Sequence, residues 1–211
     1  MTHLKRLAAA LCMAVVPMFG FSAAHAADKA ADKAAPAATV GLRGDIVYGK
    51  KDAPLVLIEY GSLTCPHCGH FANDVFPTIK KDYIDTGKVK YIFRNFILDR
   101  FDLAAAEASR CTSDPEKTKT MIATFYKTQK DWIMAENQYE AIAAIAAKSG
   151  VSKQDFAKCL TSDDLGKYLL DMRTEGAKKY KIRGVPMLIL NGKEIKEHDL
   201  AGVKKHLDSG Q

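Results

Sequence analysis

Strand-type segments lie toward both ends of this 211-residue chain, and a helical stretch separates them. The runs PLVLIEY (54–60) and KVKYIFRNFIL (88–98) are rich in Val, Ile, Leu and aromatic residues, which is typical of strands covered on both faces. The run VPMLIL (185–190) returns to this pattern, and Asn191-Gly192 after it is a strong hairpin signal. The chain therefore predicts an α/β fold whose sheet is interrupted by a helical insertion.

Shorter patterns place the remaining elements. DIVYG (45–49) predicts an edge strand, and apolar residues recur at helical spacing through 71–87, where Pro77 should kink the helix. Asp114-Pro115 and the pair Ser152 and Asp155 are helix-start signals within the insertion. The expected later helices are 102–111, one opening at 114–115, 138–150, 152–160, 163–180 and 200–209.

The N-terminal segment has the pattern of a secretory signal peptide: a basic start, the apolar stretch 7–21, and a small-residue ending. The apolar stretch is too short to span a membrane comfortably, and Pro17 interrupts it. We therefore expect export to the periplasm, with cleavage after about Ala26. The expected division is a signal peptide (1–26), a low-complexity linker (27–43), the first part of the sheet domain (44–98), a helical insertion (99–177) and the second part of the sheet domain (178–211).

Charge and cysteine content narrow the functional class. The chain has 31 Lys and Arg against 25 Asp and Glu, so removal of Lys5 and Arg6 with the signal peptide lowers the net charge from +6 to +4. This charge is mild and dispersed, and we expect no nucleic-acid partner. Cleavage also removes Cys12 and leaves four cysteines, an even number that favours disulfides in an exported protein.

Cys65 and Cys68 form a C-P-H-C motif between the strand at 54–60 and the helix that follows. Covalent haem attachment requires a histidine directly after the second cysteine, where this chain has Gly69. A disulfide across two residues closes a very small loop, so it adds little stability and carries strain. Such a bond is labile, which suits a redox centre better than a structural one.

Zinc is a less suitable interpretation, because a structural zinc site needs four ligands, commonly from two close pairs. The other two cysteines of the mature chain, Cys111 and Cys159, are far apart in sequence and supply no second close pair. A site made from the motif and its histidines would crowd every ligand onto one helical turn: Cys65, His67, Cys68 and His70. We expect no metal and no cofactor.

The position of the motif predicts different roles for its two thiols. Cys65 begins a helix, where free N–H groups and the helix dipole stabilise a thiolate and lower the thiol pKa. Pro66 fits the first turn, and His67 can add positive charge or a hydrogen bond. Cys68 lies one turn deeper and should be more buried. We expect Cys65 to be the sulfur that attacks or is attacked, and Cys68 to resolve the mixed disulfide.

The segments VLIEYGSLTCPHC (56–68) and GVPMLIL (184–190) resemble the DsbA family of exported thiol:disulfide oxidoreductases, and the resemblance extends over residues 44–208. It implies a thioredoxin fold with an inserted all-helical domain. It also implies that Val185 and Pro186 form a cis peptide that faces the cysteines and binds substrate. An acid six residues before the first cysteine is implied to transfer protons, and Glu59 occupies that position.

Two positions depart from this family pattern. The stretch YGSLT (60–64) is less aromatic than in the best-known members, and Met187 follows the proline where small or hydroxyl residues are common. Both departures concern the groove in which substrate would bind.

The resemblance implies an oxidase that donates its disulfide to newly exported, cysteine-containing proteins. A quinone-linked membrane protein of the DsbB kind would then reoxidise it. We expect a monomer. Two alternatives remain: an isomerase or reductase kept in the dithiol form, and a chaperone-like peptide-binding module whose cysteines are incidental.

Cys111 and Cys159 are the other cysteine pair of the mature chain, and each lies near the end of a predicted helix. In an oxidising compartment we expect them to form a structural disulfide within the insertion. The alternative is that each is a small buried hydrophobic residue.

Overall fold

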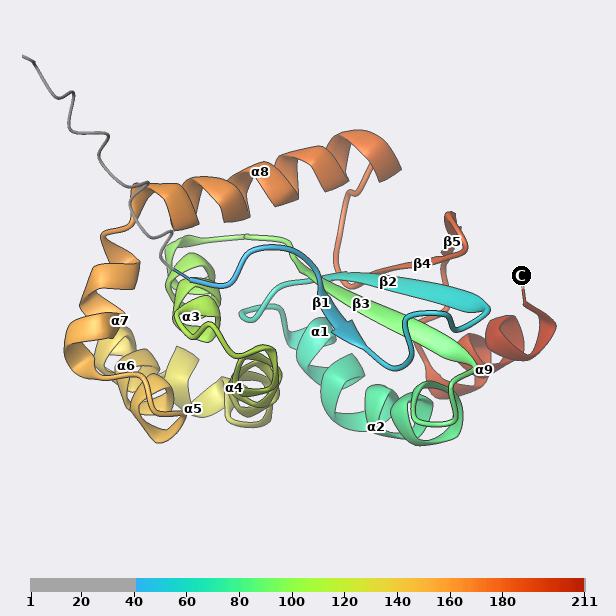
Figure 1. Cartoon of the computed structure of the whole chain (residues 1–211), viewed down its shortest axis with the longest axis horizontal. Coiled ribbons are helices and arrows are strands. Elements are labelled where there is room, and N and C mark those ends of the chain that lie inside the picture. Colours follow the sequence, from blue (N-terminus) through green and yellow to red (C-terminus); the bar gives the residue numbers. More distant parts are fainter. Residues whose placement is uncertain (1–40, 211) are drawn as a thin grey trace, which may run out of the picture. The chain divides into compact units, whose positions relative to one another are not determined.

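The computed structural model describes residues 41–210, and within them a five-stranded mixed sheet has the order β1-β3-β2-β4-β5 (Figure 1). Strands β2 and β3 are parallel, from Leu55 opposite Val89 to Gly61 opposite Asn95, and the other pairs are antiparallel. The strands are β1 (Ile46–Tyr48), β2 (Leu55–Gly61), β3 (Val89–Asn95), β4 (Met187–Leu190) and β5 (Lys193–Ile195). The predicted signal peptide and most of the predicted linker lie outside the described residues.

Two groups of helices accompany the sheet. The first follows β2 and is joined by the last helix of the chain: α1 (Pro66–His70), η1 (Phe71–Val75), α2 (Phe76–Ile79), η2 (Lys80–Ile84) and α9 (Leu200–Ser209). The second lies between β3 and β4: α3 (Arg100–Arg110), α4 (Pro115–Lys127), α5 (Gln129–Ile133), α6 (Gln138–Lys148), α7 (Lys153–Leu160) and α8 (Asp163–Tyr180). This arrangement confirms the predicted α/β fold with a helical insertion.

Both faces of the sheet are covered, as the continuous apolar strands require. Leu57 on one face packs in a cluster with Phe71 and Ile79 of the helices after β2 and with Leu207 of α9. On the other face Tyr60 packs with residues from the end of α8 and from β4, including Ala177, Tyr180, Met187 and Ile189. The cysteine motif therefore follows a strand that is held from both sides.

The helical segment after β2 differs from the single kinked helix predicted for 71–87. It begins at Pro66, directly after the cysteine that was expected to start the helix, and it contains two π-helical turns, η1 and η2. At the first of them the N–H of Phe76 donates to the carbonyl of Phe71. Pro77 follows directly and has no N–H to donate to the carbonyl four residues before it, so a widened turn at this point keeps the chain helical.

Local capping signals in the insertion were predicted correctly. Asp114 accepts hydrogen bonds from two N–H groups at the start of α4, with Pro115 at the first helical position. Ser152 accepts from the N–H of Asp155, and its hydroxyl donates to the Asp155 carboxylate. The five-residue α5 was not predicted, because it is too short to produce a helical pattern of apolar residues.

Cys111 at the end of α3 and Cys159 in α7 are joined by a disulfide, with their Cα atoms 5.8 Å apart. The side chain next to it, Arg110, is fully buried and fixes the start of the described chain. It donates to Asn95 and to the carbonyls of Leu42 and Gly44. The end of α3 thus connects the insertion, the sheet and the segment that precedes β1.

Removing this disulfide should lower the free energy of unfolding without stopping thiol chemistry at Cys65. For the variant Cys111→Ala/Cys159→Ala we expect a loss of about 2 to 4 kcal/mol, because the crosslink restricts a long loop of the unfolded chain. Guanidinium unfolding measures the loss, and the single variant Cys111→Ala should show a similar one. A change below about 0.5 kcal/mol in both would mean that the bond contributes nothing to stability.

Candidate functional site

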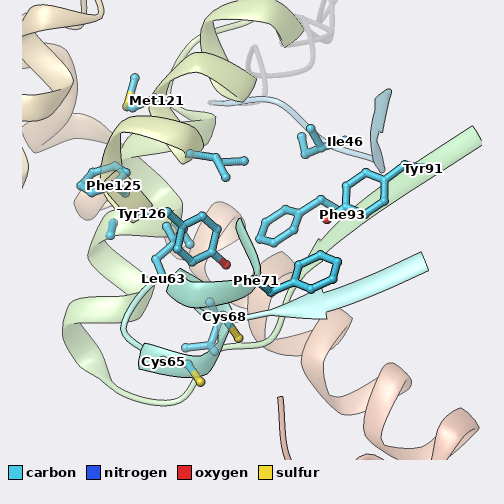
Figure 2. Packing of buried hydrophobic residues seen from close by; sticks show 14 of the residues in the cluster. Ile46, Leu63, Cys65, Cys68, Phe71, Tyr91, Phe93, Met121, Phe125 and Tyr126 are labelled. Atoms are coloured by element: carbon cyan, nitrogen blue, oxygen red, sulfur yellow. The ribbon is translucent and has the colours of Figure 1, made fainter. Parts of the chain in front are cut away.

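Cys65 and Cys68 occupy the first turn of helix, directly after the C-terminal end of β2 (Figure 2). Cys65 is the N-cap residue of α1 and has extended backbone angles, and Pro66 begins the helix. Both thiols are free, with Cys65 7% exposed and Cys68 fully buried. Both side chains are buried, and the expectation that Cys68 is the more buried of the two is confirmed.

The surroundings of Cys65 favour its thiolate and lower its pKa to about 6. The largest contribution is a hydrogen bond from the Cys68 thiol, which outweighs the opposing effect of burial. The N–H groups of Cys68 and His67 contribute less, and the positive charge of the His67 imidazole contributes least. Since His67 is exposed, its weak effect follows from solvent screening.

Cys68 has the opposite character, because its surroundings raise its pKa far above the ordinary value. The largest cause is its hydrogen bond to Cys65, followed by burial and by the negative charge of Glu59. The N–H of Ser62 lies 3.5 Å from the Cys68 sulfur and partly offsets these effects. The pair therefore consists of one thiol that ionises readily and one that keeps its proton.

Val185 and Pro186 face the first cysteine across the site. The peptide between them is cis, and the Cys65 sulfur lies 3.3 Å from the Val185 carbonyl oxygen, to which it can donate. A groove of about 360 Å³ beside them is also lined by His67 and His198. A second groove, of about 580 Å³, shares Val185, Pro186 and His198 and is also lined by Arg183 and Met187.

Glu59 lies inside the protein near the end of β2, with only 1% of its surface exposed. The Tyr91 hydroxyl donates to its Oε2 atom. Burial raises the pKa of Glu59 to about 7, which the Tyr91 hydrogen bond only partly offsets, and the negative charge of Cys65 raises it further. This carboxyl is not the solvated group at a strand end that a surface position would give, and it can gain or lose a proton near neutral pH.

Two polar side chains that the sequence did not single out hold the loop before the motif. Asp102 of α3 is fully buried and accepts hydrogen bonds from the N–H groups of Leu63 and Leu98. Gln129 of α5 donates to the carbonyls of Leu63 and Cys65, at 2.8 and 3.0 Å. Both come from the insertion, so the helical insertion positions the C-P-H-C motif from outside the sheet.

His70 belonged to the possible zinc site that the sequence did not favour. His70 is exposed, and its Nδ1 atom lies 2.6 Å from a carboxylate oxygen of Asp74. Between residues 41 and 210 no three His, Cys, Asp or Glu side chains lie close enough together to hold a metal ion. In the same range, no helix has both the length and the apolar character needed to cross a bilayer.

Comparison with known proteins places these features in a family context. A family model described as Thioredoxin matches residues 42–209. A putative protein-disulfide oxidoreductase of Rickettsia bellii is 31% identical over 164 residues, which cover 78% of this chain and 63% of the relative. The chain thus spans somewhat less than two thirds of that relative.

Two further similarities extend over more of the matched protein. A probable disulfide bond formation protein D of Bacillus cereus is 31% identical over 167 residues, 76% of each protein. The crystal structure of Wolbachia pipientis alpha-DsbA1 superimposes with a TM-score of 0.71 at 30% identity, covering 81% of this chain and 92% of that one.

Proposed function

The chain belongs to the thioredoxin family and has the DsbA-type architecture, and from this premise we propose that it is a periplasmic thiol:disulfide oxidoreductase that donates disulfides to exported proteins. The observation that carries the proposal is the opposite shift of the two thiol pKa values, low for Cys65 and high for Cys68, beside the Val185-Pro186 loop. For the signal peptide, the linker, the helical insertion and the two thioredoxin-like parts we propose the residue ranges that the sequence predicted.

The exchange reaction would proceed in two steps from the oxidised motif. A substrate thiolate attacks the Cys65 sulfur, the Cys65–Cys68 bond breaks, and Cys68 leaves as a thiolate that takes a proton from Glu59. A second substrate thiolate then attacks the substrate sulfur of the mixed disulfide, and Cys65 leaves as its stabilised thiolate. Two electrons pass from the substrate to the motif, and a quinone-linked membrane protein of the DsbB kind would remove them.

The low pKa of Cys65 favours this direction, because it lowers the free energy of the reduced form. At pH 7, a shift from 9.0 to about 6 favours the reduced form about tenfold, or about 30 mV for a two-electron couple. The advantage increases toward about a hundredfold at pH 8, where an unshifted thiol is still mostly protonated. The reduction potential should therefore be more oxidising, relative to an unshifted dithiol, as the pH rises through this range.

The substrate groove would lie along Val185 and Pro186, where a partly unfolded chain could bring a cysteine to Cys65. Met187 lines the larger groove and would contact such a segment. Substrates are proposed to be exported proteins that contain cysteines, bound by a monomer.

The direct test combines the oxidised protein with a dithiol peptide and follows disulfide transfer, with the equilibrium against glutathione measured in parallel. An oxidase should convert the peptide stoichiometrically. A potential as reducing as that of thioredoxin, about −270 mV, would refute the oxidase and favour the reductase or isomerase. Refolding of a protein with scrambled disulfides distinguishes those two alternatives.

Replacing His67 should raise the pKa of Cys65 slightly. In His67→Ser the Cys65 pKa should rise, by less than about one unit, because an exposed imidazole acts on the thiolate through screened charge. The disulfide should become less oxidising in proportion. Thiolate absorbance against pH measures the shift, and His70→Ser is the matched control, since His70 is exposed on the same helix beside Asp74. Equal behaviour of the two variants would remove His67 from the redox mechanism.

A further inference from the structure

The larger of the two grooves beside Val185 and Pro186 has a basic rim. Burial lowers the pKa of His198, which lines this groove, below its ordinary value, so the imidazole adds no positive charge near neutral pH. Three other lining side chains are basic and exposed, and one is acidic and exposed: Lys181, Arg183, Lys196 and Glu194. We call this hollow the basic groove, because its three cations exceed its one anion.

Two of these cations, Arg183 and Lys196, are not used by the fold. Within residues 41–210 neither side chain forms a hydrogen bond or an ion pair, whereas a surface lysine such as Lys153 pairs with Glu140. Lys181 differs, because it caps the C-terminal end of α8, where a positive charge is favoured by the helix dipole. Arg183 and Lys196 therefore remain available to a bound anion.

The basic groove has an apolar floor beneath this rim. Pro186 and Met187 line it and are both buried. Strand β4 pairs with β5, so Lys196, directly after β5, borders the floor that Met187 forms at the start of β4. The volume of about 580 Å³ is in the range of sites that enclose a ligand. A hollow of this kind suits an extended peptide better than a flat anionic surface such as a membrane.

The basic groove begins next to the reactive thiol. The Cys65 sulfur lies 3.3 Å from the carbonyl oxygen of Val185, which lines the groove. Arg183 precedes Val185 by two positions, so the Cα atoms of these residues are at most about 7 Å apart. An extended substrate chain advances about 3.3 Å per residue. A carboxylate about two or three positions from the substrate cysteine can therefore reach Arg183 while that cysteine is at Cys65.

We propose that the basic groove selects substrate segments in which Asp or Glu lies within about three residues of the cysteine that exchanges with Cys65. The segment binds in an extended form, with its carboxylates at Arg183 and Lys196 and its apolar part on Pro186 and Met187. This proposal names a substrate class for the thiol exchange proposed above and therefore rests on that function. Arg183 and Lys196 are specificity-determining residues and take no part in the transfer of electrons.

The test compares three dithiol peptides of the same length and cysteine spacing, in which the positions flanking the cysteines are all Asp, all Gln or all Lys. The oxidised, full-length protein oxidises each peptide at low ionic strength. Each rate is divided by the rate with hydroxyethyl disulfide, an uncharged reagent, which removes differences in intrinsic thiol reactivity. The Asp peptide should react about tenfold faster than the Lys peptide, because each exposed charge pair contributes a few-fold. In about 1 M salt, where the screening length is about 3 Å, the ratio should approach one.

Charge variants assign this preference to the basic groove. In Arg183→Gln/Lys196→Gln the ratio of the Asp rate to the Lys rate should fall toward one, and in Arg183→Glu/Lys196→Glu it should fall below one. The matched control is Lys81→Gln/Lys148→Gln, which removes the same charge from exposed lysines on η2 and α6, outside the lining of the groove. The control should keep the wild-type ratio. An equal fall in the control would show that net charge sets the preference and would overturn the proposal.

Binding without chemistry separates this proposal from the proposed function. Fluorescence anisotropy of labelled peptides with Ser in place of both cysteines measures affinity, and the Asp form should bind about tenfold more tightly than the Lys form. If no peptide is oxidised while this preference is present and is lost in Arg183→Gln/Lys196→Gln, the proposed function fails and the selectivity stands.

Equal normalised oxidation rates for the three peptides would leave the proposed function standing and overturn the selectivity. Binding to phosphatidylglycerol vesicles through Arg183 and Lys196, without a preference among the peptides, would also overturn it. The basic groove would then be assigned to a membrane surface.

Discussion

Cys65→Ser should abolish disulfide transfer, whereas Cys68→Ser should stop the reaction at a mixed disulfide with substrate. The serine hydroxyl at 65 cannot form the first sulfur–sulfur bond, so no intermediate accumulates. In Cys68→Ser the Cys65 thiolate remains available at the groove beside Val185 and Pro186. It can attack the disulfide of a peptide, so that a mixed disulfide forms and the peptide's other sulfur leaves as a thiolate. Without the second sulfur, a mixed disulfide made at Cys65 cannot be resolved from within the protein.

These outcomes are distinguished by incubating each variant with a peptide that contains a disulfide. Non-reducing electrophoresis and intact mass then detect any mixed disulfide. The control is Cys111→Ala/Cys159→Ala, which removes the other two cysteines of the predicted mature chain and should retain full transfer at a temperature where it is folded. Transfer by Cys65→Ser at the wild-type rate would contradict the redox mechanism. Retained function in that variant without transfer would favour the chaperone-like module.

The asymmetry of the two thiols was predictable from the sequence, but its main cause was not. A C-P-H-C motif after an apolar strand fixes which cysteine begins the helix, and that alone predicts the more acidic thiol. In the structure, however, the Cys68 thiol has the largest effect on the Cys65 pKa and the His67 charge the smallest. The positive charge that the sequence predicted for His67 therefore contributes less to the low Cys65 pKa than the Cys68 thiol does. The effect of His67 is small because its side chain is exposed, and the motif alone does not show how exposed that side chain is.

The residues that support the site from the helical insertion also could not be identified from the sequence. Strands, capped helices and the Asn191-Gly192 hairpin depend on short-range patterns, and the structure reproduces them. Asp102, Gln129 and Tyr126 reach the site from α3, α5 and α4, between 37 and 64 positions after Cys65. Each looks like an ordinary polar or aromatic helix residue in sequence. Only the packing of the insertion against β2 and α1 shows which of them face the motif.

Glu59→Gln should slow dithiol oxidation and increase the stability of the folded protein at neutral and alkaline pH. The rate should fall by about a hundredfold, the lower end of what a positioned general acid or base contributes. The amide fits the same site, because its oxygen can accept from Tyr91 and its NH₂ group can face the Tyr126 hydroxyl. The side-chain volume is unchanged, so a loss of rate would reflect the lost proton transfer.

The stability effect has a definite sign and pH window. Burial raises the Glu59 pKa from 4.5 to about 7, so between these values the folded protein holds a proton that the unfolded chain has lost. The free energy of unfolding of the wild type therefore falls as the pH rises through this window, by about 3 kcal/mol in total from this group. Gln cannot ionise, so the variant should escape this loss.

The measurement is urea unfolding of both proteins from pH 4 to 8, in the dithiol form to which the raised Glu59 pKa applies. Asp102 and Glu107 also have raised pKa values, about 6 and about 7, and add a pH dependence of the same sign to both proteins. The free energy of unfolding of the variant minus that of the wild type therefore reports on Glu59 alone. This difference should be near zero at pH 4 and approach about 3 kcal/mol in favour of the variant at pH 8. A difference that stays constant with pH, together with unchanged oxidation rates, would mean that Glu59 neither titrates in the folded protein nor exchanges protons with Cys68.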